Sequence, residues 1–177
     1  MIESKGYKRA LDISQKLLES FPKSNFNFVG EFGSKIDAKY FSDFKKKYNF
    51  TNSINYWGPC DNFNLKVKIF KSNDLLILPS YSEAYPLTIL EAFSVGMPVI
   101  ATDTGAVSEI IGEKYGLCVP DAKNNKVFID TFSNSVSILL NSWDSEASKY
   151  CIDNFHECWS LKSYGKKVIS IFKKCDI

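Results

Sequence analysis

The sequence is organised around one segment, residues 74–98, which reads DLLILPSYSEAYPLTILEAFSVGMP. Its apolar start, residues 75–78, ends at Pro79 and predicts a fully buried strand. After a polar loop, Pro86 stands where a first helical residue is expected, because proline lacks the N–H that this position leaves unused. Apolar residues continue at helical spacing to Gly96, a typical stop signal. The segment therefore predicts a strand, a loop and a helix in succession.

Two carboxylates accompany this predicted unit, Glu83 in the loop and Glu91 in the helix. Ligands of open α/β sheets bind beyond the carboxyl ends of the strands, where this loop is expected to lie. The start of the helix would direct free N–H groups into the same crevice, which suits a phosphate. Glu91 lies about one and a half turns into the helix, at ~1.5 Å per residue. There it could accept two hydrogen bonds from neighbouring hydroxyls, such as a ribose diol.

These residues carry a resemblance to a known family. The pattern PSxxEaxPLtxLEAfsxGxPVIatdtGaxsEiI resembles the donor-binding signature of the retaining glycosyltransferases of family 4, which have the two-domain GT-B fold. Its specific features are the paired glutamates eight positions apart and the later Gly105 and Glu109. The resemblance extends from about Lys5 to the C-terminus and matches only the C-terminal half of such an enzyme. It implies that residues 1–177 are one donor-binding domain without the N-terminal acceptor domain.

The resemblance also implies roles for individual residues. Glu83 would contact hydroxyls of the donor sugar near the reacting carbon, and Lys5 would grip the donor diphosphate, so both are candidate catalytic residues. Glu91 would bind the ribose. Backbone N–H groups at the helix start would bind phosphate, from Tyr85, Pro86, Leu87 and Thr88. The alternatives are ordinary ones: a solvated loop carboxylate, a solvated lysine near a terminus, an exposed helical glutamate and an ordinary helix start.

Elsewhere in the chain, apolar residues recur either at strand spacing or at helix spacing. They predict strands over residues 25–30, 53–57, 98–102 and 116–119, and helices over 7–21, 36–48, 107–111, 126–141, 144–156 and 160–174. The stretch 65–71 alternates like a strand, but we interpret it as a helix because the parallel strand that follows needs a crossover. Strands alternating with helices predict an α/β fold with a doubly wound, Rossmann-like parallel sheet.

One strand is missing from this arrangement. The family's domain opens with a strand before the Lys-Gly loop, and in the order 3-2-1-4-5-6 that strand is central. Here residues 1–4 stand in its place, and the family's phosphate-binding arginine is absent too. Either the chain is a piece of a longer protein, or something else fills this position. We therefore expect a sheet without its first strand, and little activity from this chain alone.

Composition excludes several other classes. A net charge of +2 is too small to indicate nucleic-acid binding, and no apolar run approaches the ~20 residues that cross a bilayer. Five scattered cysteines suit reduced thiols. We expect a cytoplasmic protein, at most peripheral at the inner membrane face through the lysines of 160–174. The spacing of Cys151, His156 and Cys158 fits no zinc pattern, and no GxGxxG, GxxxxGK[ST] or GxSxG motif occurs.

The functional hypothesis is transfer of a sugar, with retention, from a UDP-, GDP- or ADP-sugar to a glycan or lipid acceptor, without cofactor or metal. This chain would be the donor-binding half, and an N-terminal domain or partner chain would complete it. One alternative is a non-catalytic nucleotide-sugar-binding module or subunit. Another is a nucleotide-sugar epimerase, which would need further acid–base residues. The sequence leaves open the nucleotide base, the sugar, the acceptor and the oligomeric state.

Overall fold

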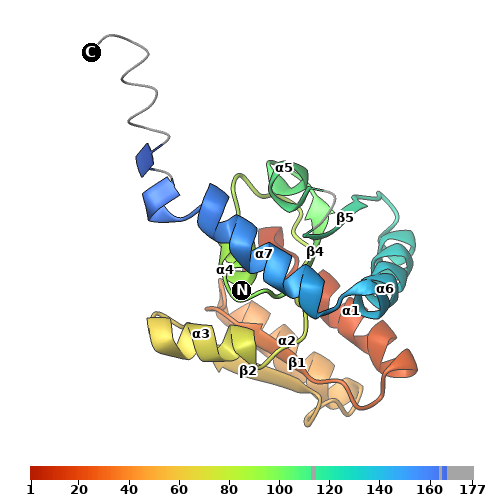
Figure 1. Cartoon of the computed structure of the whole chain (residues 1–177). Coiled ribbons are helices and arrows are strands. Elements are labelled where there is room, and N and C mark those ends of the chain that lie inside the picture. The colour runs from red at the N-terminus through yellow and green to blue at the C-terminus, as the bar shows by residue number, and fades with distance from the viewer. Residues whose placement is uncertain (113–114, 164, 167–177) are drawn as a thin grey trace.

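The computed structural model (Figure 1) describes residues 1–112, 115–163 and 165–166, so most of the predicted helix 160–174 lies outside the described residues. The elements follow one another as η1 (Glu3–Lys5), α1 (Tyr7–Ser20), β1 (Phe26–Val29), α2 (Lys35–Lys47), β2 (Ile54–Gly58), α3 (Phe63–Lys71), β3 (Leu76–Leu78), α4 (Leu87–Phe93), β4 (Val99–Asp103), α5 (Val107–Ile111), β5 (Gly116–Pro120), α6 (Asn125–Ser142) and α7 (Ser145–Cys158). The ambiguous stretch 65–71 belongs to helix α3, which confirms the predicted helix.

The strands form two sheets rather than one. β1 pairs with β2, and β4 pairs with β3 on one side and β5 on the other. Every pairing is parallel, which confirms the predicted α/β class. In the strand order 3-2-1-4-5-6, β2 and β1 stand at positions 3 and 2, and β3, β4 and β5 stand at positions 4, 5 and 6. The vacant position 1 therefore lies between β1 and β3. Over the described ranges no ladder joins those two strands.

Helices cover both faces of the sheets. Ile100 of β4 packs against α1 and α6, in a core that includes Ile13 and Phe128. Its neighbours on the strand, Val99 and Ala101, pack against α4, α5 and α7 instead. Successive side chains of a strand point to opposite faces, so α1 and α6 lie on one face and α4, α5 and α7 on the other. A third core joins α1, α2 and β2.

Two sequence predictions for the central unit need correction. The residues of β3 are half-buried rather than fully buried, because β3 has a paired strand on one side only. Pro86 is the N-cap of α4, not its first helical residue, since its ψ of 101° is extended and the helix begins at Leu87. The predicted stop is confirmed: Gly96 follows the helix with a φ of 75°.

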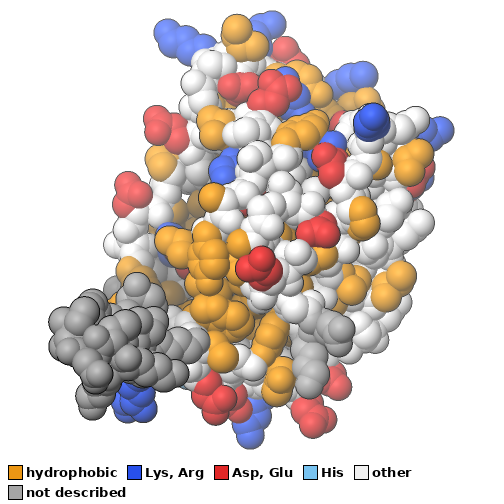
Figure 2. All heavy atoms as spheres, turned by 90° about the horizontal axis from the view of Figure 1, so that it is seen from above, with side chains coloured by type: hydrophobic (Ala, Val, Ile, Leu, Met, Phe, Trp, Pro, Cys, Tyr) orange, Lys and Arg blue, Asp and Glu red, His pale blue; other side chains and the backbone are white. Residues whose placement is uncertain are grey.

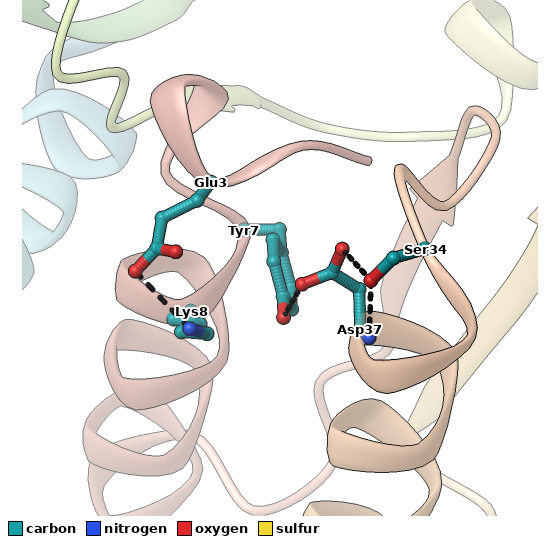
Figure 3. A network of polar contacts seen from close by, with 5 residues as sticks. All are labelled: Glu3, Tyr7, Lys8, Ser34 and Asp37. Atoms are coloured by element: carbon teal, nitrogen blue, oxygen red, sulfur yellow. Dashed lines mark hydrogen bonds and ion pairs between the residues drawn. The ribbon is translucent and has the colours of Figure 1, made fainter.

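A polar network ties α1 to α2 (Figure 3). The Tyr7 hydroxyl donates to one carboxylate oxygen of Asp37 at 2.7 Å, and the Ser34 hydroxyl donates to the other at 2.7 Å. These two hydrogen bonds, that from Ser34 first, lower the pKa of Asp37. Burial and the contact with Asp37 raise the pKa of Tyr7. Beside them, Lys8 contacts Glu3 at 3.1 Å. The network fixes the first turn of α1, next to the site described below.

The face in Figure 2 carries charged side chains of both signs, with hydrophobic side chains gathered in one area. This mixture agrees with the small net charge of +2. Among the described residues, none of the helices combines the length and apolarity needed to cross a membrane.

We expect Asp37→Asn to destabilise the protein in a pH-dependent way. Because folding lowers the pKa of Asp37, the carboxylate stabilises the protein above its ordinary pKa of 3.8. That contribution is lost as the pH falls through the lower folded-state pKa. Urea midpoints of wild type and D37N should therefore differ by a constant amount from neutral pH down to about pH 5, and converge below about pH 4. A difference that does not change down to pH 2 would contradict this assignment.

Candidate functional site

One cavity, with a volume of about 1510 Å³, brings the predicted site residues together. It opens where β3 ends and extends between β1 and β3. All seven positions singled out in the sequence contribute to its wall: Lys5, Glu83, Tyr85, Pro86, Leu87, Thr88 and Glu91. The structure thus places residues 5 and 91 at one surface, although the chain separates them widely.

Glu83 is held at the centre of this wall by two neighbours. The ammonium of Lys5 lies 2.6 Å from one carboxylate oxygen, and the hydroxyl of Ser80 donates to the other at 2.7 Å. The Glu83 side chain is only 5% exposed, whereas that of Lys5 is 48% exposed. The loop carboxylate is therefore not freely solvated. The lysine faces the open cavity and keeps donors to spare, since an ammonium has three.

Lys5 is near the N-terminus, yet the fold holds it in place. The backbone N–H of Tyr81 donates to the carbonyl of Ser4 at 2.9 Å, which joins η1 to the loop after β3. Gly6 follows with a φ of 68°, and a Cβ at this position would lie 2.0 Å from the carbonyl oxygen of Pro79. Only a glycine allows the two backbones to approach so closely. This close contact places Lys5 beside Glu83.

A second glycine fixes the other side of the loop. A Cβ on Gly105 would lie 1.9 Å from the carbonyl oxygen of Glu83, and Gly105 has a φ of 58°. Next to it, the N–H of Ala106 donates to the carbonyl of Ala84 at 3.1 Å. Gly105 thus combines a positive φ with a close approach to the backbone of Glu83. The turn before α5 therefore supports the backbone that carries Glu83.

Glu91 has a partner that the sequence analysis did not identify. The ammonium of Lys66, on α3, lies 2.9 Å from one oxygen of Glu91, and both side chains are 37% exposed. Glu91 is therefore a partly exposed carboxylate with an ion-pair partner, and its contact with a ribose diol stays a prediction. Its hydrogen bond to Glu91 raises the pKa of Lys66. Lys66 also lines the cavity, but a lysine on the polar side of a predicted helix gives no signal of this role.

Arg9 is another residue that the sequence analysis missed. Arg9 is 4% exposed, and its guanidinium lies between two rings, 3.7 Å from the centroid of Tyr81 and 4.1 Å from that of Phe128. It also pairs with Asp121 at 2.8 Å. Such a cation–π sandwich is stabilising when it is desolvated. Arg9 thereby anchors the loop of Glu83 to α1 and α6.

The start of α4 completes the wall. Pro86 is buried, while Tyr85 and Leu87 are 50% and 65% exposed. The helix has seven residues, and no side chain caps its N-terminus. Lys5 and Lys66 add two full positive charges to the same cavity wall. Within the described residues, no three His, Cys, Asp or Glu side chains are grouped so as to hold a metal ion.

We expect Gly105→Ala to cost considerably more stability than Gly58→Ala. Both glycines have positive φ, but a Cβ at Gly58 would meet nothing within 4 Å. The control therefore bears only the strain of a left-handed alanine, about 1–2 kcal/mol. Gly105→Ala adds an overlap with Glu83, about 1–3 kcal/mol more. Denaturant unfolding would measure both, and equal losses would show that the close approach is unimportant.

Comparisons with known proteins identify the family of this chain. The profile of the family described as "Glycosyl transferases group 1" matches residues 1–154. The chain is 28% identical over 108 residues to the sulfoquinovosyl transferase SQD2 of Arabidopsis thaliana, covering 61% of this chain and 20% of that protein. It is 26% identical over 178 residues to a sucrose synthase of Melioribacter roseus, covering 95% of this chain and 22% of that protein. It thus spans about a fifth of these relatives' length.

A solved structure shows the same fold. The pneumococcal O-GlcNAc transferase GtfA, solved in complex with UDP and GlcNAc, superposes with a TM-score of 0.79 at 16% identity. The match covers 97% of this chain and 33% of that one. The fold is that of the C-terminal domain of GT-B glycosyltransferases.

Proposed function

Because this chain belongs to the group 1 glycosyl transferases, we propose that its cavity binds the nucleotide-sugar donor of a retaining, family 4 type sugar transfer. The observation that carries the proposal is the convergence of all seven predicted positions on one wall, with each key carboxylate beside a lysine. The 177 residues would be the donor-binding half. The acceptor, a glycan or lipid, would be held mainly by an N-terminal domain or a partner chain.

Lys5 and Glu83 would act together on the sugar and its leaving group. In the reaction, negative charge develops on the diphosphate as its bond to the anomeric carbon breaks. Lys5 would stabilise that charge with the N–H donors that Glu83 leaves unused. A carboxylate offers about four acceptor sites, so Glu83 could keep Lys5 and Ser80 while it also accepts hydrogen bonds from sugar hydroxyls. Tyr85 to Thr88 would lie along the diphosphate.

Retention would follow from attack on the face that the diphosphate leaves. The acceptor oxygen would form its bond to the anomeric carbon there, and its proton would pass to an oxygen of the departing phosphate. This scheme needs no protein nucleophile. It also needs no metal, because Lys5 supplies the positive charge.

Glu91 would accept the ribose diol. One of its oxygens is engaged by Lys66, and the other has no protein partner among the described residues. Because the pair is over a third exposed, it contributes little stability, about 0–1 kcal/mol. A diol could therefore bind without a large loss of protein–protein interaction. Lys66 would remain beside the nucleotide as a second cation.

We expect donor nucleotides to bind and Glu91→Ala to weaken that binding. A panel of UDP, GDP, ADP and their sugars would be tested by calorimetry and thermal shift, starting with UDP because the GtfA structure contains it. Losing hydrogen bonds to a carboxylate costs about 1.5–3 kcal/mol, so the dissociation constant should rise at least about tenfold. Glu146→Ala, an exposed glutamate on α7 away from the cavity, is the control. No selective binding by a folded protein would refute the proposal.

We expect EDTA to leave the dissociation constant of the best nucleotide sugar unchanged, because the proposed site balances phosphate charge with lysine. Lys66→Met and Lys68→Met form a matched pair for the lysine contribution. Both are on α3, but only Lys66 of the two lines the cavity. K66M should therefore lower the affinity for the nucleotide sugar, and K68M should leave it unchanged. A loss of binding in EDTA that Mg²⁺ restores would contradict the metal-free scheme.

The separation of the two sheets favours a second candidate, a nucleotide-sugar-binding module that is inactive on its own. Donor binding without sugar transfer or donor hydrolysis by these 177 residues would fit both readings. Transfer that appears when an acceptor-binding partner is added would distinguish a catalytic half from a non-catalytic module.

A further inference from the structure

Helix α2 concentrates the positive charge of this chain. Its 13 residues include five lysines and two aspartates, a net charge of +3, while the whole chain has only +2. The Asp37 carboxylate points from α2 towards Tyr7 of α1 (Figure 3) and accepts its hydrogen bond. Asp37 therefore belongs to the contact between the two helices. The outer surface of α2 keeps the lysines and only one acidic side chain, that of Asp43.

The buried residues of α2, Phe41 and Phe44, mark the side of the helix that packs against the core. At about 100° per residue, the opposite side is formed by two adjacent rows of exposed side chains. We call these residues the α2 face: Lys35, Lys39 and Lys46 in one row, and Ile36, Tyr40, Asp43 and Lys47 in the other. Asp43 is paired with Lys39 at 3.4 Å. Four lysines and one aspartate leave the α2 face with a net charge of +3.

Apolar surface lies among these lysines. Ile36 is 80% exposed, and Tyr40, one turn further along the helix, is 40% exposed. The ammonium of Lys8, on α1, lies 5.3 Å from the centroid of the Tyr40 ring, so the basic surface continues onto the neighbouring helix. An isoleucine that is this exposed gains nothing from burial within the chain. The α2 face therefore combines dense positive charge with an apolar ridge.

The occupant that fits this surface has negative charge spread over an area and an apolar layer directly beneath it. A bilayer that contains anionic lipids offers both, and basic amphipathic helices lie in its interface with their axis in the membrane plane. Lysine side chains reach the headgroups while their stems cover apolar surface, and tyrosine is enriched at this level of the membrane. A nucleic acid would pair with the lysines but would leave Ile36 without an apolar environment.

The dimensions of the α2 face suit a flat contact. Lys35 and Lys46 are eleven residues apart, which is about 16 Å along a helix. The lysines between and beside them lie on the same side of the helix, so they can approach a planar surface together. Each lysine near an anionic membrane surface strengthens binding about fivefold. Several lysines acting together therefore produce measurable association, although one alone does not.

We infer that the α2 face is a docking surface for a bilayer containing anionic lipids, with the lysines at the headgroups and Ile36 at the boundary of the acyl chains. The inference assigns this contact to α2, independently of the lysines of residues 160–174. It does not depend on nucleotide-sugar binding, so a donor panel without any hit would leave it standing.

Co-sedimentation of the full chain with lipid vesicles tests the inference. One set of vesicles contains phosphatidylcholine alone, and in the other about a third of the lipid is phosphatidylglycerol. The chain should bind the anionic vesicles and not the neutral ones. Binding should weaken as salt is raised, because salt screens exposed charges. The double variant K39Q/K46Q should lower the partition coefficient at least about tenfold, and I36Q at least about threefold.

Each variant has a matched control. K68Q/K71Q removes the same two charges from exposed positions of α3, which lies on the other side of the sheets with the core of α4 and α7. I138Q changes an isoleucine of α6 that is 63% exposed. Both controls should leave the partition coefficient unchanged. Circular dichroism and urea midpoints should show that all four variants remain folded, since every substituted side chain is exposed.

The outcomes are decisive in both directions. Binding that requires anionic lipid and is weakened by both α2 variants, but by neither control, supports the inference. Absence of binding to the anionic vesicles overturns it. So does an equal loss in the α3 control, which would indicate net charge alone, and so does binding that survives both α2 variants. Binding to a soluble oligonucleotide that matches vesicle binding and ignores I36Q would assign the face to a polyanion and also overturns it.

Discussion

The contact between Gly6 and the carbonyl of Pro79 is the constraint on which the site depends. It lets the turn before α1 lie directly on the backbone that leaves β3, at a distance that any side chain would prevent. The Ser4–Tyr81 hydrogen bond and the ring of Tyr81 over Arg9 secure the same approach. As a result, a lysine near the start of the chain and a glutamate about eighty residues later form a 2.6 Å ion pair.

Much of the fold was predictable because it depends on local pattern. The apolar run before Pro79, the helix spacing up to Gly96 and the crossover argument for α3 are properties of single segments. The half-burial of β3 was not predictable in this way, because burial depends on a neighbouring strand. Pro86 is compatible with two adjacent helix positions, and local sequence does not decide between them.

The site was predictable only in part for the same reason. Glu83 and Glu91 stand at fixed spacing within one motif, so the sequence places them on one unit. Lys66 and Arg9 reach that unit from other elements, and their partners are 25 residues away or more. Pairings of this kind are produced by packing. Nothing in the spacing of a lysine on α3 points to a carboxylate on α4.

The position of α1 has a consequence for how this protein unfolds. Tyr7 and Leu11 belong to the core with α2 and β2, whereas Ile13 and Leu17 belong to the core with β4 and α6. With no ladder between β1 and β3 in the described chain, this helix and the Asn27–Asn73 hydrogen bond are prominent links between the halves. Cooperativity between two cores rests on what connects them. The β1–α2–β2 half is thus positioned to open as a separate unit while β3, β4 and β5 stay folded.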